Sequence, residues 1–135
     1  MDPQQIHLGA ILVAAVSTFV LGGLWYSPVL FGKAWMRVNA FTEGDLQRRG
    51  VGRPFIGSAF FALIMATNLA FFLADAKTDV WWGMTAGALA GFGWVATSFG
   101  TIALFENRSW TYLGIHAGYQ IAAFVLMGLI LGGWR

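Results

Sequence analysis

Four long stretches without Asp, Glu, Lys or Arg constrain the fold of this chain more than any other feature. They cover residues 3–32, 54–74, 80–105 and 109–134. A bilayer-spanning helix needs about 20 mostly apolar residues, and each stretch is long enough. Since lipid cannot satisfy backbone polar groups, each stretch should be helical. The sequence predicts an all-α, integral membrane four-helix bundle, with spans at about residues 6–27, 55–74, 80–104 and 110–133.

The chain has too few charges for a soluble protein. Its 135 residues are 58% hydrophobic and 10% charged, whereas soluble domains carry about 25% charged residues. The length fits one transmembrane domain over residues 1–135. Cysteine is absent, which excludes disulfides, thiolate metal sites and cysteine nucleophiles. Nothing in the small net charge of +2 indicates a nucleic-acid partner.

The positive charges predict how the chain sits in the membrane. With four spans, the loop at residues 33–54 and the turn that holds Arg108 share one side, and together they contain six of the eight Lys and Arg residues. The positive-inside rule therefore predicts a cell inner membrane protein with a cytoplasmic loop at 33–54 and both termini outside. Such basic residues act mainly as topology anchors, and a specific lipid-headgroup or phosphate site is the alternative. The candidate headgroup residues are Lys33, Arg48, Arg49 and Arg53.

Aromatic residues agree with these boundaries. Trp25 and Tyr26 mark the predicted inner interface, where the ring bodies are dry and their polar tips wet. Pro28 should end or kink the first helix near Ser27, because it removes a backbone donor. Trp94 lies inside the third span, and we expect it to pack against a glycine of a neighbouring helix.

Glycines at intervals of four predict close helix packing. Helices in lipid gain little from hydrophobicity, so close backbone approach matters more. The two readings are packing within one compact bundle and an interface of a homo-oligomer, and both can hold on different faces. The predicted packing residues are Gly83, Gly87 and Gly91 in the third span, and Gly114, Gly118, Gly128 and Gly132 in the fourth.

Uncharged polar residues in the inner half of the spans predict a ligand pocket there. No charged residue lies well inside a span, so only such groups can form a site. Their alternative roles are structural, because Ser and Thr bond the backbone of their own helix and Gln bridges helices. The candidates are Tyr26 and Ser27 in the first span, Thr97, Ser98 and Thr101 in the third, and His116, Tyr119 and Gln120 in the fourth.

Catalytic patterns are absent from the sequence. There is no Gly-rich phosphate loop after a strand, no His-Glu-x-x-His, and no acid placed to form a Ser-His-Asp arrangement with His7 or His116. The two histidines fall in different halves of the membrane, which disfavours a metal or haem site. We therefore expect no enzyme, no catalytic residues, no metal and no cofactor.

The chain resembles a bacterial membrane family known as domain of unknown function 1761 (DUF1761). The most specific likeness is Leu-Trp-Tyr-Ser-Pro followed by Phe-Gly-Lys-Ala-Trp-Met, over residues 24–36. Further likenesses are Thr-Glu-Gly-Asp-Leu at 42–46, Phe-Glu-Asn-Arg at 105–108, and Gly-Tyr at 118–119. His116 departs from the family pattern, which has Asp before Ala-Gly-Tyr. The resemblance implies a four-helix membrane protein and supplies no activity.

Two functions follow as hypotheses. The first is a small multi-pass protein that binds or passes a small neutral or apolar molecule through the bundle. The second is a structural or accessory protein that associates with membrane proteins or lipids through its glycine faces and basic loop. The expected partners are membrane lipids and further copies of the chain.

Overall fold

The computed structural model describes all 135 residues, and every regular element is a helix. A short 3-10 helix at Pro3–Gln5 precedes α1 (Leu8–Trp25), α2 (Gly32–Asn39), α3 (Glu43–Arg49) and α4 (Gly52–Phe72). Then follow α5 (Val80–Ala90), a π-helical segment (Gly91–Ala96), α6 (Thr97–Phe105) and α7 (Trp110–Gly133). Four helical stretches are long and apolar enough to cross a membrane, with α5, the π-helical segment and α6 forming one of them. The predicted all-α membrane bundle is confirmed.

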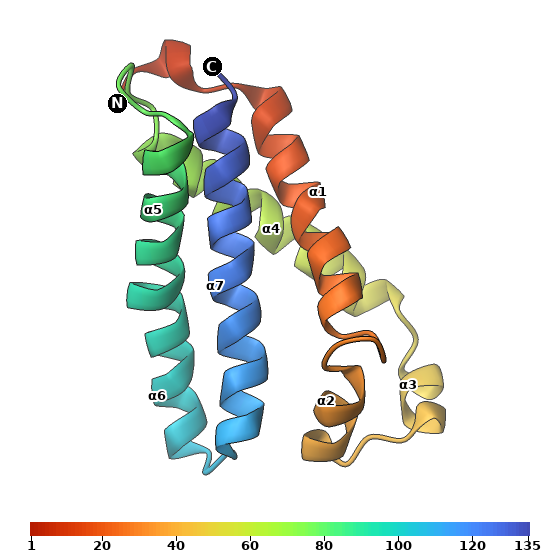
Figure 1. The fold of residues 1–135 in the computed structure, drawn as a ribbon. Helices are drawn as coiled ribbons and strands as arrows, with labels where there is room; N and C mark the ends of the chain where they lie inside the picture. Colours follow the sequence, from red (N-terminus) through yellow and green to blue (C-terminus); the bar gives the residue numbers. More distant parts are fainter.

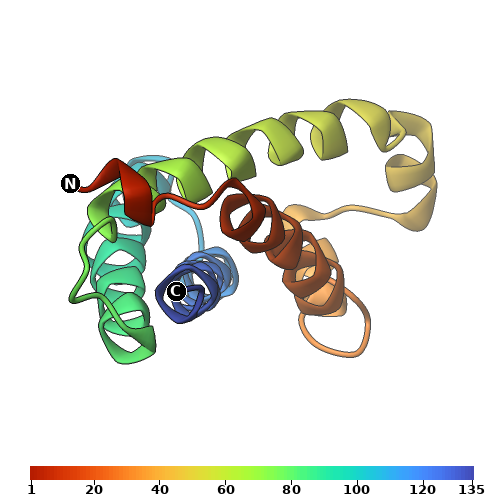
Figure 2. The same cartoon turned by 90° about the horizontal axis from the view of Figure 1, so that it is seen from above.

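Helix α7 occupies the middle of the bundle. Figure 1 shows it between the α5–α6 rod and α1, with α4 crossing behind. Both termini lie at one end, here called the terminal end, and α2, α3 and the α6–α7 turn lie at the other, the loop end (Figure 1). Seen from above, α4 runs away from the α5–α6 rod towards α3 (Figure 2). The loop end of the bundle is therefore less closely packed than the terminal end.

The hydrophobic core fills the terminal half. It consists of buried residues of α1, α4 and α7, with Ala14, Ala66 and Met127 fully enclosed at 0% exposure. The first buried residue of α4 is Ala62, ten positions after the helix begins. Small side chains at these positions let the helices approach closely, which is the main source of packing energy in lipid.

Helices α5 and α7 pack through glycine backbones. A Cβ atom built on Gly132 would lie 3.0 Å from Cα of Gly83, and one built on Gly91 would lie 3.0 Å from Cα of Ile121. Gly87 and Gly128 are equally close to the facing backbone. Gly118 instead faces the ring of Trp25, and Gly114 has nothing within 4 Å. The glycine stripes are thus used within the chain, with Gly114 as the exception.

Helix α1 ends in a tight turn before Pro28. The amide of Phe31 donates to Trp25 O at 2.9 Å, and the amide of Gly32 donates to Ser27 O at 2.8 Å. Gly32 is buried against this turn, and a Cβ there would lie 2.6 Å from the carbonyl carbon of Ser27. The turn reverses the chain so that α2 packs back against the end of α1, and the edge of the Trp35 ring meets Tyr26 at 5.7 Å between centroids.

Helix α3 begins with a capping box. The amide of Asp45 donates to Oγ1 of Thr42 at 3.1 Å, and the amide of Thr42 donates to Oδ2 of Asp45 at 2.9 Å. Hydrogen bonds to the Asp45 carboxyl, first from the Thr42 amide, then from the Thr42 side chain and from Arg48, lower its pKa. The box fixes where α3 starts and hence where its arginines lie.

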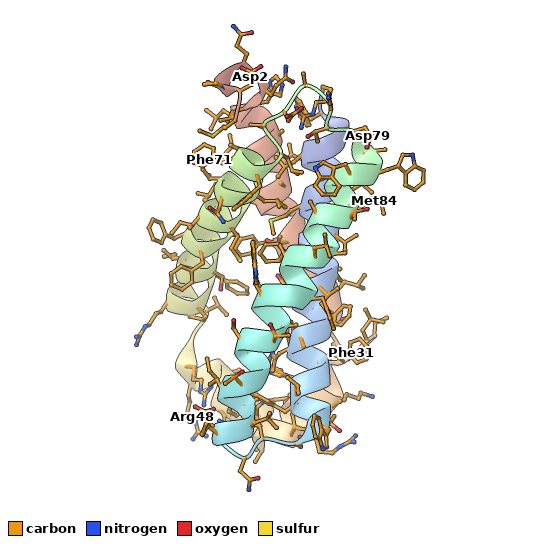
Figure 3. All side chains as sticks on the ribbon, turned by 90° about the vertical axis from the view of Figure 1, so that its left-hand side faces the viewer. Asp2, Phe31, Arg48, Phe71, Asp79 and Met84 are labelled. Atoms are coloured by element: carbon orange, nitrogen blue, oxygen red, sulfur yellow. The ribbon has the colours of Figure 1, made fainter.

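Polar contacts tie the terminal end together. The Arg135 guanidinium donates to Leu73 O at 2.7 Å and to Oε1 of Gln5 at 3.1 Å, and the Asp2 amide donates to Ala74 O at 2.7 Å. Figure 3 shows Asp2 and Asp79 at this end and Arg48 at the opposite end. The two ends therefore differ: hydrogen bonds join the N-terminal segment, the end of α4 and the C-terminus at one end, whereas the short helices α2 and α3 lie at the other (Figure 1).

Candidate functional site

A cavity of about 910 Å³ lies at the loop end. Its walls are the last two turns of α1, the first half of α7 and the start of α4, and α2 and α3 contribute Trp35 and Arg49. Its volume falls in the range of roughly 300–1,000 Å³ that is typical of small-molecule sites. The cavity exists because α4 is not packed against the bundle before Ala62.

A tyrosine–histidine pair forms one wall. The hydroxyl of Tyr26 lies 2.7 Å from Nδ1 of His116, a hydrogen bond between the end of α1 and the middle of α7. The His116 ring also meets the edge of Tyr112 at 4.6 Å and of Phe99 at 5.5 Å. The pair is half-buried, and Nε2 of His116 has no hydrogen-bond partner in the chain.

Two further hydrogen bonds hold the α1 and α7 walls together. The hydroxyl of Tyr119 donates to Thr18 O at 2.9 Å, and Nε1 of Trp25 donates to Ile115 O at 2.9 Å. Each aromatic ring therefore spans from one helix to the backbone of the other. In lipid such bonds between helices are worth on the order of 1 kcal/mol each. This wall is rigid, whereas the opposite wall at the start of α4 has no comparable ties.

Several polar groups in the lining are free to bind a ligand. Gln120, Ser58 and Arg53 line the cavity, and their side chains form no hydrogen bond within the protein. Arg49 also lines it and makes no ion pair, although its guanidinium lies 4.2 Å above the Phe41 ring. Groups of this kind give a ligand site its specificity.

Four of the eight predicted ligand residues lie together here, namely Tyr26, His116, Tyr119 and Gln120. Ser27 points elsewhere, with its hydroxyl donating to Leu24 O at 2.6 Å. Thr97, Ser98 and Thr101 are exposed on α6 and outside the cavity. The structure does not bring these three residues to the cavity, because the helix before them does not keep α-helical periodicity.

The π-helical segment explains this difference. Continued as an α-helix, the face that carries Gly83, Gly87 and Gly91 would next include Trp94, Ser98 and Thr101. Ala96 and Ala103 are buried instead, because the wider turn after Gly91 spans five residues. The Thr97 hydroxyl donates to Gly93 O at 2.7 Å within this segment. The Thr97 side chain therefore supplies a hydrogen bond to a backbone carbonyl of the wide turn, because lipid offers no partner to such a group.

Trp94 also departs from expectation. Its ring is 64% exposed and packs beside Phe72 at 6.1 Å between centroids, on the outside of the bundle. It does not lie on a glycine of a neighbouring helix. The same wide turn carries Trp94 outward, since the segment Gly91–Ala96 contains it.

The candidate headgroup residues divide into two groups. All four are exposed, but Lys33 and Arg48 lie outside the cavity, and Arg48 pairs with Asp45 on its own helix. Arg49 and Arg53 line the cavity, which sequence reasoning missed, as it missed Trp35, Phe55 and Ser58. The sequence contains only one hint that the loop folds back over the end of α1. That hint is the clustering of arginines immediately before an apolar run.

Replacing Tyr26 with Phe is expected to loosen the cavity wall without unfolding the chain. The variant keeps the ring that packs on Trp35 but leaves Nδ1 of His116 without its partner, which costs about 1 kcal/mol. The free energy of unfolding in mixed detergent micelles measures this. Tyr112→Phe is the control, because the hydroxyl of Tyr112 makes no hydrogen bond within the chain. Equal losses in both variants would show that the Tyr26–His116 bond contributes nothing.

Comparison with known proteins gives one finding. A family model described as "Protein of unknown function (DUF1761)" matches residues 9–132, which include all four spans except for one residue at each outer end. No curated protein matches the chain. No solved structure matches it either.

Proposed function

Since the chain belongs to the DUF1761 family, whose description assigns no activity, we propose a function from the cavity itself: this membrane protein binds a small, mostly apolar molecule at the loop end of its bundle. The supporting observation is a cavity of about 910 Å³ that combines aromatic walls with unpartnered polar groups. Carrying such a molecule across the membrane is the extension of this proposal, and it needs motion of the α4 wall. Binding without catalysis is proposed because no carboxylate lines the cavity beside His116.

The accessory role through glycine faces has less support. Gly83, Gly87, Gly128 and Gly132 contact one another within the chain, so this stripe is not free for a partner. Within the spans, beyond their first residues, Gly114, Gly93, Gly57 and Gly23 have no neighbour within 4 Å of the Cβ position, and of these Gly23 lines the cavity, so the other three are open to another helix. A homo-oligomer through these positions stays a prediction.

The proposed setting is a cell inner membrane with the loop end in the cytoplasm. The support is the count of positive residues, with six at the loop end and two at the terminal end of the eight in the chain. In this orientation the cavity lies in the cytoplasmic leaflet, and both termini lie outside.

Filling the cavity tests the proposed function. A Cβ on Gly23 has nothing within 4 Å, and Gly23 lines the cavity, so Gly23→Leu adds a side chain there whose first atom has open space. Native mass spectrometry of the protein extracted from its membrane is expected to show a bound small molecule in the wild type and none in Gly23→Leu.

Gly57→Leu is the matched control. Gly57 also has open space around its Cβ position, lies within a helix, and does not line the cavity. This variant should retain the bound molecule. An adduct that survives in Gly23→Leu, or is missing from the wild type as well, contradicts the proposal.

A further inference from the structure

The charges at the cavity are one-sided. Arg49 and Arg53 belong to its lining, and no Asp or Glu does. Among the acids at the loop end, Asp45 pairs with Arg48, and Glu106 lies 3.6 Å from Nε of Arg108. Glu43, at the start of α3, forms no ion pair and does not line the cavity. Arg53 has no hydrogen-bond or ion-pair partner in the chain, and Arg49 forms no ion pair although Asp45 lies on the same helix. A partly enclosed site with two guanidinium groups and no carboxylate in its lining favours an anionic group in its ligand.

The apolar part of the cavity extends from these arginines towards the middle of the membrane. Phe19, Gly22 and Gly23 of α1 line it, as does Phe55 of α4. On α1 the lining runs from Thr18 to Tyr26, which is about 12 Å along the helix axis. The cavity is thus an elongated space with a basic mouth at the loop end and an aromatic body deeper in the bundle.

This polarity matches the way an amphiphile lies in one leaflet. The headgroup of a lipid is at the surface, where basic residues attract it, and its chain points to the bilayer centre. Arg49 lies at the end of α3, outside the spans, and Arg53 is the second residue of the span formed by α4, at its loop-end limit. The amide of Gln120 and the hydroxyl of Ser58 are further donors with no partner in the protein.

We propose that the ligand is an anionic amphiphile, with one acyl chain in the aromatic part of the cavity and its carboxylate or phosphate head at Arg49 and Arg53. This deepens the proposed function and rests on it. The head can belong to a free fatty acid or to an anionic membrane lipid, and the chemistry of recognition is the same for both. Inorganic phosphate alone lacks the chain and should bind weakly.

A competition assay on the full chain tests this. The protein is placed in phosphatidylcholine nanodiscs, and dansyl-labelled undecanoate is added as the probe. Its binding is measured by energy transfer from the tryptophan residues, of which Trp35 lines the cavity. Dodecanoate should displace the probe, whereas dodecanol and inorganic phosphate should do so at least about tenfold less well. Displacement by nanodiscs that contain phosphatidylglycerol would identify the bilayer as the source of the ligand, and its absence would point to a free fatty acid.

Charge removal supplies the matched comparison. The double variant Arg49→Gln, Arg53→Gln should weaken dodecanoate binding about tenfold or more, since each charge-assisted contact is lost. The control double variant Arg37→Gln, Arg48→Gln removes the same charge from the same loop, but neither residue lines the cavity, so binding should be unchanged. If both double variants bind dodecanoate equally weakly, the effect comes from general surface charge and the proposal is overturned.

The assay distinguishes a failure of the anionic-head proposal from a failure of the proposed binding function. If dodecanol competes as well as dodecanoate, and the double variant at 49 and 53 binds normally, the anionic head is refuted while the cavity stays a binding site. If Gly23→Leu binds the probe like the wild type, both proposals fall.

Discussion

Gly128→Ala is expected to separate α5 from α7 and destabilise the whole bundle. The new Cβ would lie 2.8 Å from the carbonyl carbon of Gly83 and still closer to its oxygen. Both partners are backbone, so no side chain can rotate away, and the helices themselves must move apart. Overpacking of this kind costs about 1–3 kcal/mol and occasionally more. Titration with a denaturing detergent, followed by circular dichroism, should show a loss of about 3 kcal/mol in the free energy of unfolding.

Gly114→Ala is the control on the same helix. Gly114 has no atom within 4 Å of its Cβ position, and alanine favours the helix over glycine by about 1 kcal/mol. This variant should therefore be as stable as the wild type or slightly more so. Similar destabilisation by both changes would show that glycine contributes to α7 through the helix itself and not through contact with α5.

The second large effect is expected from Gly32→Ala. A Cβ at this position would lie 2.7 Å from Ser27 O and 2.6 Å from its carbonyl carbon, again with backbone on both sides. The turn after α1 must open, which moves α2 and takes Trp35 away from Tyr26. We expect a loss of about 1–3 kcal/mol in stability. We also expect binding of the dansyl-labelled undecanoate to be lost, because Trp35 lines the cavity.

Gly52→Ala separates this local effect from a general sensitivity of the loop. Gly52 begins α4 at the same end of the molecule, and a Cβ there meets nothing within 4 Å. It should bind the probe normally. Normal binding by Gly32→Ala would mean that the turn has no part in forming the cavity.

The membrane fold could be predicted because lipid imposes simple requirements. Uncharged runs of sufficient length have to be helices, and the glycine interval of four indicates where helices meet closely. The stripe of Gly83 and Gly87 indeed faces Gly128 and Gly132. Pro28 likewise indicated the end of α1, which stops at Trp25.

The site could be predicted only on its α1 and α7 walls. The sequence grouped Tyr26 with His116, Tyr119 and Gln120 because regular helical spacing places the three residues of α7 on one face, and the structure places all four in the cavity lining. The positions of Thr97, Ser98 and Thr101 depended on the π-helical turn after Gly91, and that turn follows from packing against α7, which no local pattern reveals. Arg49 reaches the cavity because α3 folds back over it, and Arg53 reaches it from the start of α4, so both positions depend on tertiary structure.

The late start of packing along α4 has a mechanical consequence. The first ten residues of α4, about 15 Å of helix, contain no buried residue. This part of α4 can therefore pivot about Ala62, where packing against the core begins. A swing of about ten degrees at Ala62 would move its tip by about 2.6 Å. The width of the cavity entrance then depends on the angle of α4 and not on the size of any side chain. One protein can therefore accommodate ligands of different widths.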